Sequence, residues 1–226
     1  MDSNQQAILK TSENALQAKA AAVRAGYYDD PYIAPFAHEP RRGGRPPYVQ
    51  PIIKRGTHAR VCCIDRMIRT FAKRVTEQHD RRLDQRRQVD DSEQDEQEQE
   101  CILQIVVLGC GKDTVFFRHY EGLTAQNANV TLKWFEVDHP PMISEKASII
   151  RSNPNVFDSA QVHAVENDVY EVEPTLGVSC TLLGHDLRET GIMKSCNVSD
   201  AIRPHQLYSF WNACSCTCPK RTAKTY

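Results

Sequence analysis

The second half of the chain alternates between apolar runs of strand length and segments that are typical of helices or turns. Ile102–Leu108 is an almost uninterrupted apolar run, as expected for a central strand buried on both faces. Leu132–Val137, Gln161–Val165 and Thr181–Gly184 predict three further strands. Because a helical segment separates the first two strands, the pattern predicts an α/β fold with a parallel sheet, within a core at residues 101–200.

The first part of the chain has the pattern of two helices, and we assign residues 1–76 to an N-terminal helical segment. An alanine-rich stretch, Ser12–Arg24, begins with a residue that favours the N-cap, and Gly26 can end the helix. Further along, apolar residues recur at helical spacing and predict an amphipathic helix with one face on the core: Val61, Ile64, Ile68, Phe71 and Val75.

A polar segment, residues 77–100, separates this helical region from the core. It consists largely of Gln, Asp, Glu and Arg, with almost nothing apolar. Such a composition cannot offset the entropy cost of ordering, so we predict a disordered insertion. An acidic tether for a partner is the alternative interpretation.

Composition bounds the class of protein. The 226 residues, 40% of them hydrophobic, can build one α/β core, and a net charge of −1 gives no basic footprint for nucleic acid. No run approaches the roughly 20 apolar residues of a spanning helix, and Met1–Ala7 lacks the order of a secretory signal. We therefore expect a cytoplasmic, monomeric protein without membrane association, whose nine cysteines are reduced thiols.

The candidate chemistry lies where predicted strands end. Gly109 and Gly111 follow the first strand, where the absence of Cβ atoms lets the backbone turn sharply and approach a ligand. Asp138 ends the second strand, where nucleotide-binding α/β folds carry an acid for ribose hydroxyls, and Asp186 follows a later strand. The alternative is an ordinary turn with exposed acids at strand ends.

Five segments, in the same order, resemble the leucine carboxyl methyltransferase family: Gly26–Tyr32, Arg55–Val61, Leu108–Thr114, Phe135–Asp138 and Gly184–Arg188. The resemblance covers about Lys19 to Arg188. It implies a Rossmann-like class I S-adenosylmethionine-dependent methyltransferase fold, and methylation of the C-terminal leucine carboxylate of the protein phosphatase 2A catalytic subunit. A related methyltransferase that modifies the wybutosine base of tRNA is the alternative within this family.

The resemblance also implies roles for individual residues. Lys19 and Arg60 would lie near the methionine end of the cofactor, where the guanidinium of Arg60 could pair with the cofactor's carboxylate. Gly109 would contact the cofactor through its backbone, and Asp138 would bind the ribose. Asp186 and Leu187 would border the adenine. A carboxylate substrate is already ionised at neutral pH and needs no general base, so we name no catalytic residue.

The end of the chain departs from the expected pattern. After Arg188 an apolar fourth strand ending in an acid is expected, but residues 201–226 are neither apolar nor periodic. Codons that encode these residues can be chosen so that, read one base earlier, they encode such a strand. We therefore interpret residues 201–226 as an out-of-frame tail. Genomic bases that cannot encode both peptides would contradict this interpretation. The fold would then be incomplete at the C-terminal end. Either the sequence is truncated by a gene-model or sequencing error and the native product is the active enzyme, or the short chain is a real, non-catalytic fragment. Zinc binding by Cys214, Cys216 and Cys218 is disfavoured because one-residue gaps are unusual for zinc ligands, so we predict no metal.

Overall fold

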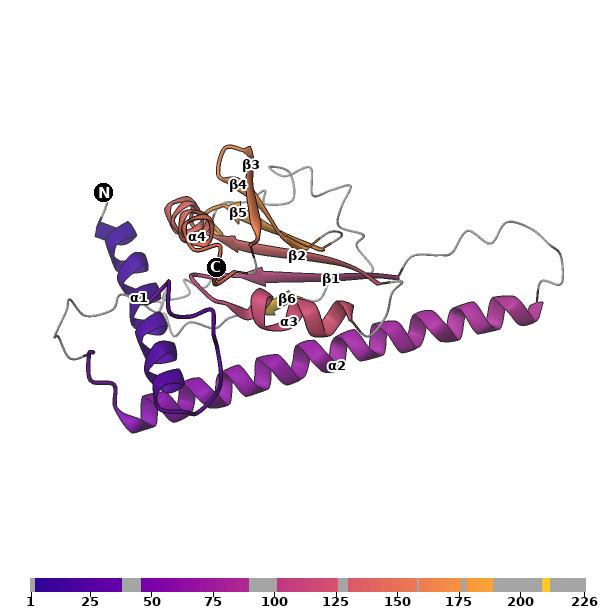
Figure 1. Cartoon of the computed structure of the whole chain (residues 1–226), viewed down its shortest axis with the longest axis horizontal. Coiled ribbons are helices and arrows are strands. Elements are labelled where there is room, and N and C mark those ends of the chain that lie inside the picture. The colour runs from indigo at the N-terminus through magenta and orange to yellow at the C-terminus, as the bar shows by residue number, and fades with distance from the viewer. Residues whose placement is uncertain are drawn as a thin grey trace, which may run out of the picture.

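The computed structural model describes residues 3–37, 46–89, 101–125, 130–157, 159–175, 178–188 and 209–211. Within these ranges two helices come first, strands and helices then alternate from β1 to α4, and the described elements after α4 are all strands (Figure 1). The elements are α1 (Ser3–Arg24), α2 (Pro51–Val89), β1 (Cys101–Leu108), α3 (Val115–Thr124), β2 (Val130–Asp138), α4 (Pro140–Ser152), β3 (Gln161–Glu166), β4 (Val169–Thr175), β5 (Val178–Gly184) and β6 (Ser209–Trp211). The predicted α/β fold class is confirmed.

The described strands form one sheet in the order β3-β4-β5-β2-β1-β6. Neighbours pair in parallel from β5 through β2 and β1 to β6, whereas β3 and β4 add an antiparallel edge. Along the chain the parallel strands first step from β1 to β2 to β5, and β6 then returns to the other side of β1. The strand order therefore reverses at β1, and ligands of open α/β sheets bind beyond the carboxyl ends of the strands at such a reversal.

The four described helices all contribute to one apolar core against the same face of the sheet. Trp134 of β2 is fully buried, and its ring lies 5.7 Å from that of Phe116 in α3. Ile143 and Ile150 of α4 join this core, as does Ile68 of α2. Right-handed connections that step in one direction across a sheet leave their helices on one face, which explains why α3 and α4 share a layer.

The structure confirms the two N-terminal helices and corrects their boundaries. Helix α1 begins at Ser3, so Ser12 lies inside the helix and is not its N-cap. Gly26 has a φ of +73° just past the end of α1, and the N–H of Tyr27 donates to the carbonyl of Ala22 at 3.1 Å. This left-handed glycine ends the helix as predicted.

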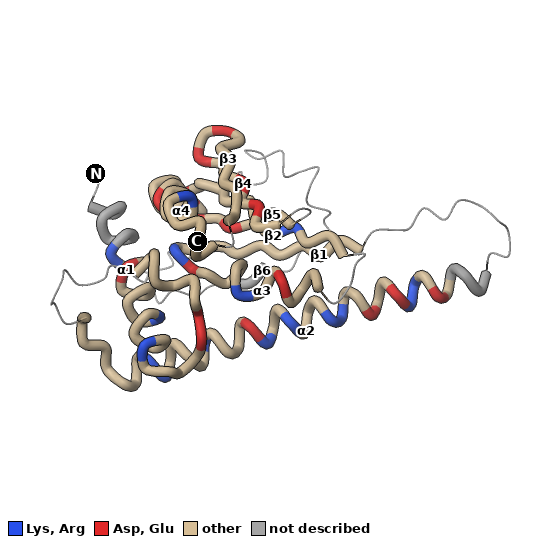
Figure 2. The backbone as a smooth tube through the Cα atoms, in the orientation of Figure 1, with Lys and Arg blue, Asp and Glu red and all other residues tan. Residues whose placement is uncertain are grey.

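Helix α2 continues to Val89, so the prediction of disorder is wrong for residues 77–89. Figure 2 shows basic and acidic residues interspersed along this part of α2, and Figure 1 shows its end projecting beyond the strands. Gln, Arg and Glu favour helices intrinsically, and Lys73 and Glu77 form an ion pair one turn apart at 3.8 Å. Residues 90–100 of the predicted insertion lie outside the described residues.

Two strands were not predicted from the sequence. β4 pairs with both β3 and β5, but most of its side chains are half-exposed or exposed and it contains Pro174, so its apolar pattern is weak. β6 pairs with β1 at Ser209–Trp211, within the segment that we interpret as an out-of-frame tail. The rest of residues 201–226 lies outside the described residues. None of the described helices has the length and hydropathy that a membrane-spanning segment requires.

Two adjacent residues of α2 test the packing of this helix on the core. Ile68 is 1% exposed and Met67 is 52% exposed. We expect Ile68→Ala to lower the free energy of unfolding by about 2–5 kcal/mol, because it removes buried methyl groups and leaves a cavity. Met67→Ala should change it by less than about 0.5 kcal/mol. Urea unfolding followed by circular dichroism measures both, and equal losses would contradict the packing of α2.

Candidate functional site

The loop between β1 and α3 is built from residues that turn the backbone sharply. Gly109 and Gly111 have φ angles of +66° and +53°, in the left-handed region that glycine adopts without strain. The N–H of Gly109 donates to the carbonyl of Val137 at 2.8 Å, which ties the loop to the end of β2. The predicted glycine turn therefore lies at the carboxyl ends of β1 and β2.

Asp138 connects this loop to the next connection of the sheet. Its carboxylate accepts hydrogen bonds from the N–H of Gly111 at 2.6 Å and of His139 at 2.7 Å, one on each oxygen. A carboxylate has about four acceptor positions, so this side chain keeps capacity for two ligand hydroxyls. Its position is fixed by the backbone on both sides, which suits a residue that orients a ligand.

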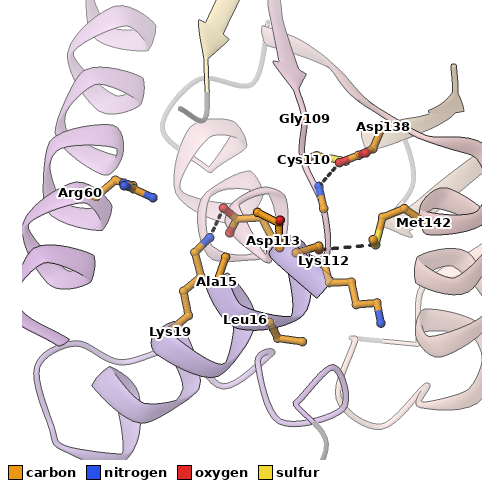
Figure 3. Close-up of a pocket in the computed structure, with 13 residues that line it drawn as sticks. Ala15, Leu16, Lys19, Arg60, Gly109, Cys110, Lys112, Asp113, Asp138 and Met142 are labelled. Carbon is orange, nitrogen blue, oxygen red and sulfur yellow. Dashed lines mark hydrogen bonds and ion pairs between the residues drawn. The ribbon is translucent and has the colours of Figure 1, made fainter. Parts of the chain in front are cut away.

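A cavity of about 180 Å³ lies beside this loop. It is bordered by α1, by the N-terminal part of α2, by the β1–α3 loop and by the first turn of α4 (Figure 3). Four of the six predicted cofactor residues line it: Lys19, Arg60, Gly109 and Asp138. The structure thus brings together residues that are up to 119 positions apart in the sequence.

Lys19 and Asp113 form an ion pair at the edge of the cavity. Burial alone would raise the pKa of the Asp113 carboxyl, but Lys19 and Arg118 outweigh burial and hold that pKa well below its usual range. Asp113 thus stays ionised and gives the ammonium of Lys19 a fixed place. The predicted contact of Lys19 with the cofactor would therefore have to be shared with Asp113.

Arg60 approaches the cavity from the opposite side, extending from α2 toward the place where Lys19 and Asp113 meet (Figure 3). Its side chain is exposed. A guanidinium in this position can form a bidentate pair with a carboxylate that enters the cavity. The cavity therefore presents two cations at one end and Asp138 near the other.

Asp186 and Leu187 do not line the cavity. They follow β5 at the same edge of the sheet, where the N–H of His185 donates to the carbonyl of Asp138 at 2.8 Å. Arg188 donates to both carboxylate oxygens of Asp186, at 2.8 and 3.1 Å from its Nε, and these bonds hold the pKa of Asp186 below its usual range. The structure therefore pairs Arg188 with Asp186.

A second charged network anchors the segment Tyr27–Tyr32 beneath the loop. Thr114 occupies the N-cap position of α3, but its side chain makes no capping hydrogen bond. Its hydroxyl instead donates to the Asp30 carboxylate at 2.5 Å. Arg118 donates to Asp65 of α2 at 2.7 Å and lies 3.5 Å from the Asp30 carboxylate. Burial raises the pKa of Asp30 against the opposing effects of Thr114 and Arg118.

Several cavity residues were not identified from the sequence. Asp113 was assigned no role at the cofactor, and α1 and α4 contribute residues that carry no recognisable motif: Thr11, Ser12, Ala15, Leu16 and Met142. Spacing alone could not place α1 against the loop. Within the described ranges, no group of three or more His, Cys, Asp or Glu is arranged to bind a metal, and Cys214, Cys216 and Cys218 lie outside those ranges.

Comparisons with known proteins point in one direction. The family model for leucine carboxyl methyltransferase matches residues 7–176. Leucine carboxyl methyltransferase 1 of Rattus norvegicus is 26% identical over 204 residues, covering 88% of this chain and 51% of the relative. The Bos taurus protein of that name is 24% identical, with 88% and 51% covered, and the Schizosaccharomyces pombe protein is 29% identical, with 65% and 36% covered. The chain thus spans about half the length of the first of these relatives.

The charge on Asp113 has a consequence for stability. We expect Asp113→Asn to lower the free energy of unfolding at neutral pH by about 3 kcal/mol or more, because Lys19 and Arg118 lose their buried anionic partner. The folded pKa lies below the unfolded value of about 3.9, so this contribution is fully present above that value. It is lost as the pH falls through the folded pKa.

Urea unfolding of both proteins at about pH 7, 5 and 3 checks the sign of this effect. The difference in free energy of unfolding between wild type and Asp113→Asn should be the same at the two higher pH values and smaller at the lowest. Glu173→Gln, at an exposed position of β4, serves as the control. A gap that widens toward acid pH would show that Asp113 is not stabilised as a carboxylate.

Proposed function

The chain belongs to the leucine carboxyl methyltransferase family, and on that premise we propose that it binds S-adenosylmethionine and transfers its methyl group to a C-terminal leucine carboxylate. The observation that carries the proposal is the cavity that brings Lys19, Arg60, Gly109 and Asp138 together at the reversal of strand order. The chain spans about half the length of these relatives, so methyl transfer by this chain is a proposal, which the peptide experiment below tests.

The residues of the cavity fit the chemistry of this cofactor. Asp138 keeps acceptor capacity for the ribose hydroxyls, and the backbone of Gly109 allows close approach without a Cβ atom. Lys19 and Arg60 supply cations for the methionine carboxylate. Asp186 and Leu187 are proposed to border the adenine, from the same edge of the sheet but outside the cavity as the structure has it.

The reaction asks for positioning rather than for proton transfer. When bound, S-adenosylmethionine supplies an electrophilic methyl group on a sulfonium. A leucine carboxylate is ionised at neutral pH and can attack without a general base. The protein would accelerate the step by aligning the carboxylate with the methyl carbon and by excluding water, which in well-oriented systems contributes roughly 7–11 kcal/mol.

For the substrate we propose the C-terminal tail of the protein phosphatase 2A catalytic subunit, which the family resemblance implies. The names of the relatives, which specify a leucine carboxyl group, support a protein carboxylate. The tRNA-modifying alternative is given no support by the charge of the chain, which is −1. A protein carboxylate is therefore the substrate class that the experiments below address.

The cofactor site can be tested on this chain alone. We expect saturable binding of S-adenosylmethionine in a calorimetric titration, and a loss of roughly tenfold or more in affinity for Asp138→Ala, because hydrogen bonds to a charged acceptor are removed. Glu173→Ala, which changes an exposed acid of the same sheet, should bind as the wild type does. A folded wild-type chain that does not bind the cofactor would contradict the assignment.

Methyl transfer is tested with peptide substrates and labelled S-adenosylmethionine. A peptide that ends in leucine with a free carboxylate should gain a base-labile methyl ester, whereas the same peptide with a C-terminal amide should gain nothing. Asp138→Ala serves as the variant lacking cofactor binding. If the chain binds cofactor but leaves the carboxylate peptide unmodified, it acts as a cofactor-binding fragment and the proposed transfer by this chain is wrong.

A further inference from the structure

A lysine is buried beneath the cavity, and the proposed reaction does not use it. Lys146 of α4 is 1% exposed, and its ammonium donates to the backbone carbonyl of Asp113 at 2.5 Å and to the carboxylate of Glu136 in β2. Burial lowers the pKa of an ammonium, but Glu136 outweighs burial and raises the pKa of Lys146 above its usual value. The side chain therefore keeps its charge inside the core.

The position of Lys146 is otherwise apolar. It lies on the face of α4 that carries Ile143, Ala147 and Ile150, each of them buried in the main core. A buried ion pair rarely stabilises more than a well-packed apolar pair of the same volume. The charge at this position is therefore better explained by what the ammonium binds than by core stability.

What it binds is the end of the loop that lines the cavity. Asp113 is held from two sides: Lys146 of α4 binds its carbonyl, and Lys19 of α1 binds its carboxylate. Three residues earlier, the backbone carbonyl of Cys110 accepts a hydrogen bond from the N–H of Asp113 at 3.1 Å, and the N–H of Gly111 donates to the Asp138 carboxylate. The two ammonium groups thus fix the last residue of a five-residue turn whose first residue is fixed by β2.

We propose that Lys146 is a positioning residue for the cofactor, which fixes the β1–α3 loop by clamping the carbonyl of Asp113 to Glu136 of β2. The inference rests on the proposed function, because it assumes that the cavity beside this loop binds the cofactor. Lys146 itself does not line the cavity and acts through the backbone of residues 109–113. Loss of the clamp releases this backbone and disturbs the contacts of Gly109, Gly111 and Asp138.

The test separates positioning from stability by comparing three variants. Lys146→Met leaves Glu136 as an unpaired buried carboxylate and should lose both stability and affinity. Glu136→Leu combined with Lys146→Met replaces the whole pair by apolar groups and should recover most of the stability. Ile150→Ala, on the same face of α4 and outside the cavity lining, should lose stability but keep cofactor affinity.

Affinity for S-adenosylhomocysteine is measured by calorimetry on the folded fraction of each protein, and stability by urea unfolding. We expect the double variant to bind roughly tenfold more weakly than the wild type, the change that corresponds to one hydrogen bond to a charged group. Ile150→Ala should bind within about threefold of the wild type. A double variant that binds as tightly as the wild type would overturn the proposal, as would an equal loss of affinity in Ile150→Ala.

Amide hydrogen exchange keeps the inference separate from the proposed function. The double variant should exchange the amides of residues 109–114 faster than Ile150→Ala does, whether or not a ligand is present. If wild type fails to bind S-adenosylhomocysteine but the exchange difference is seen, the cofactor assignment fails, and Lys146 positions a loop of other function. Equal exchange in the two variants would refute the clamp itself.

Discussion

A carboxylate buried in the loop before α3 must be compensated by cations, and the arrangement of the site depends on this requirement. Asp113 is 7% exposed, and removing a charge from water costs several kcal/mol unless it is paired. Its compensation comes from Lys19 of α1 and Arg118 of α3. Because these cations lie on different elements, satisfying one carboxylate fixes where α1 meets the loop after β1. The cavity lies along that contact.

The sheet places this charged centre where it can act on a ligand. The strand order reverses at β1, and open α/β sheets have a crevice beyond the carboxyl ends of their strands at such a reversal. Gly109 and Gly111 turn the chain within this gap, and Asp138 at the end of β2 holds the turn by its carboxylate. Topology thus provides the opening, and backbone hydrogen bonds give it a defined shape.

The sequence predicted those parts of the site that depend on strand ends. Gly109 and Asp138 were identified because a buried strand has a readable pattern and its last residue has a known place in the sheet. Asp186 was placed at the correct edge, but its side chain turns to Arg188, a local contact that strand periodicity does not report. Pairing between distant elements, such as Lys19 with Asp113, could not be predicted because no spacing encodes which helix covers which loop.

Two charged residues at apolar positions form a buried pair that was not predicted from the sequence, although their positions indicate it. Glu136 lies in β2 close to Trp134 and Val137, which are both buried. Lys146 lies on the otherwise apolar face of α4. Either residue alone could be an exposed exception to the pattern. Taken together, an acid in a buried strand and a base on the apolar face of the helix that follows it predict an internal pair, since neither can be buried alone at acceptable cost. The same reasoning indicates function, because a pair that adds little to stability is retained most readily where one member also holds a backbone group, as Lys146 holds the carbonyl of Asp113.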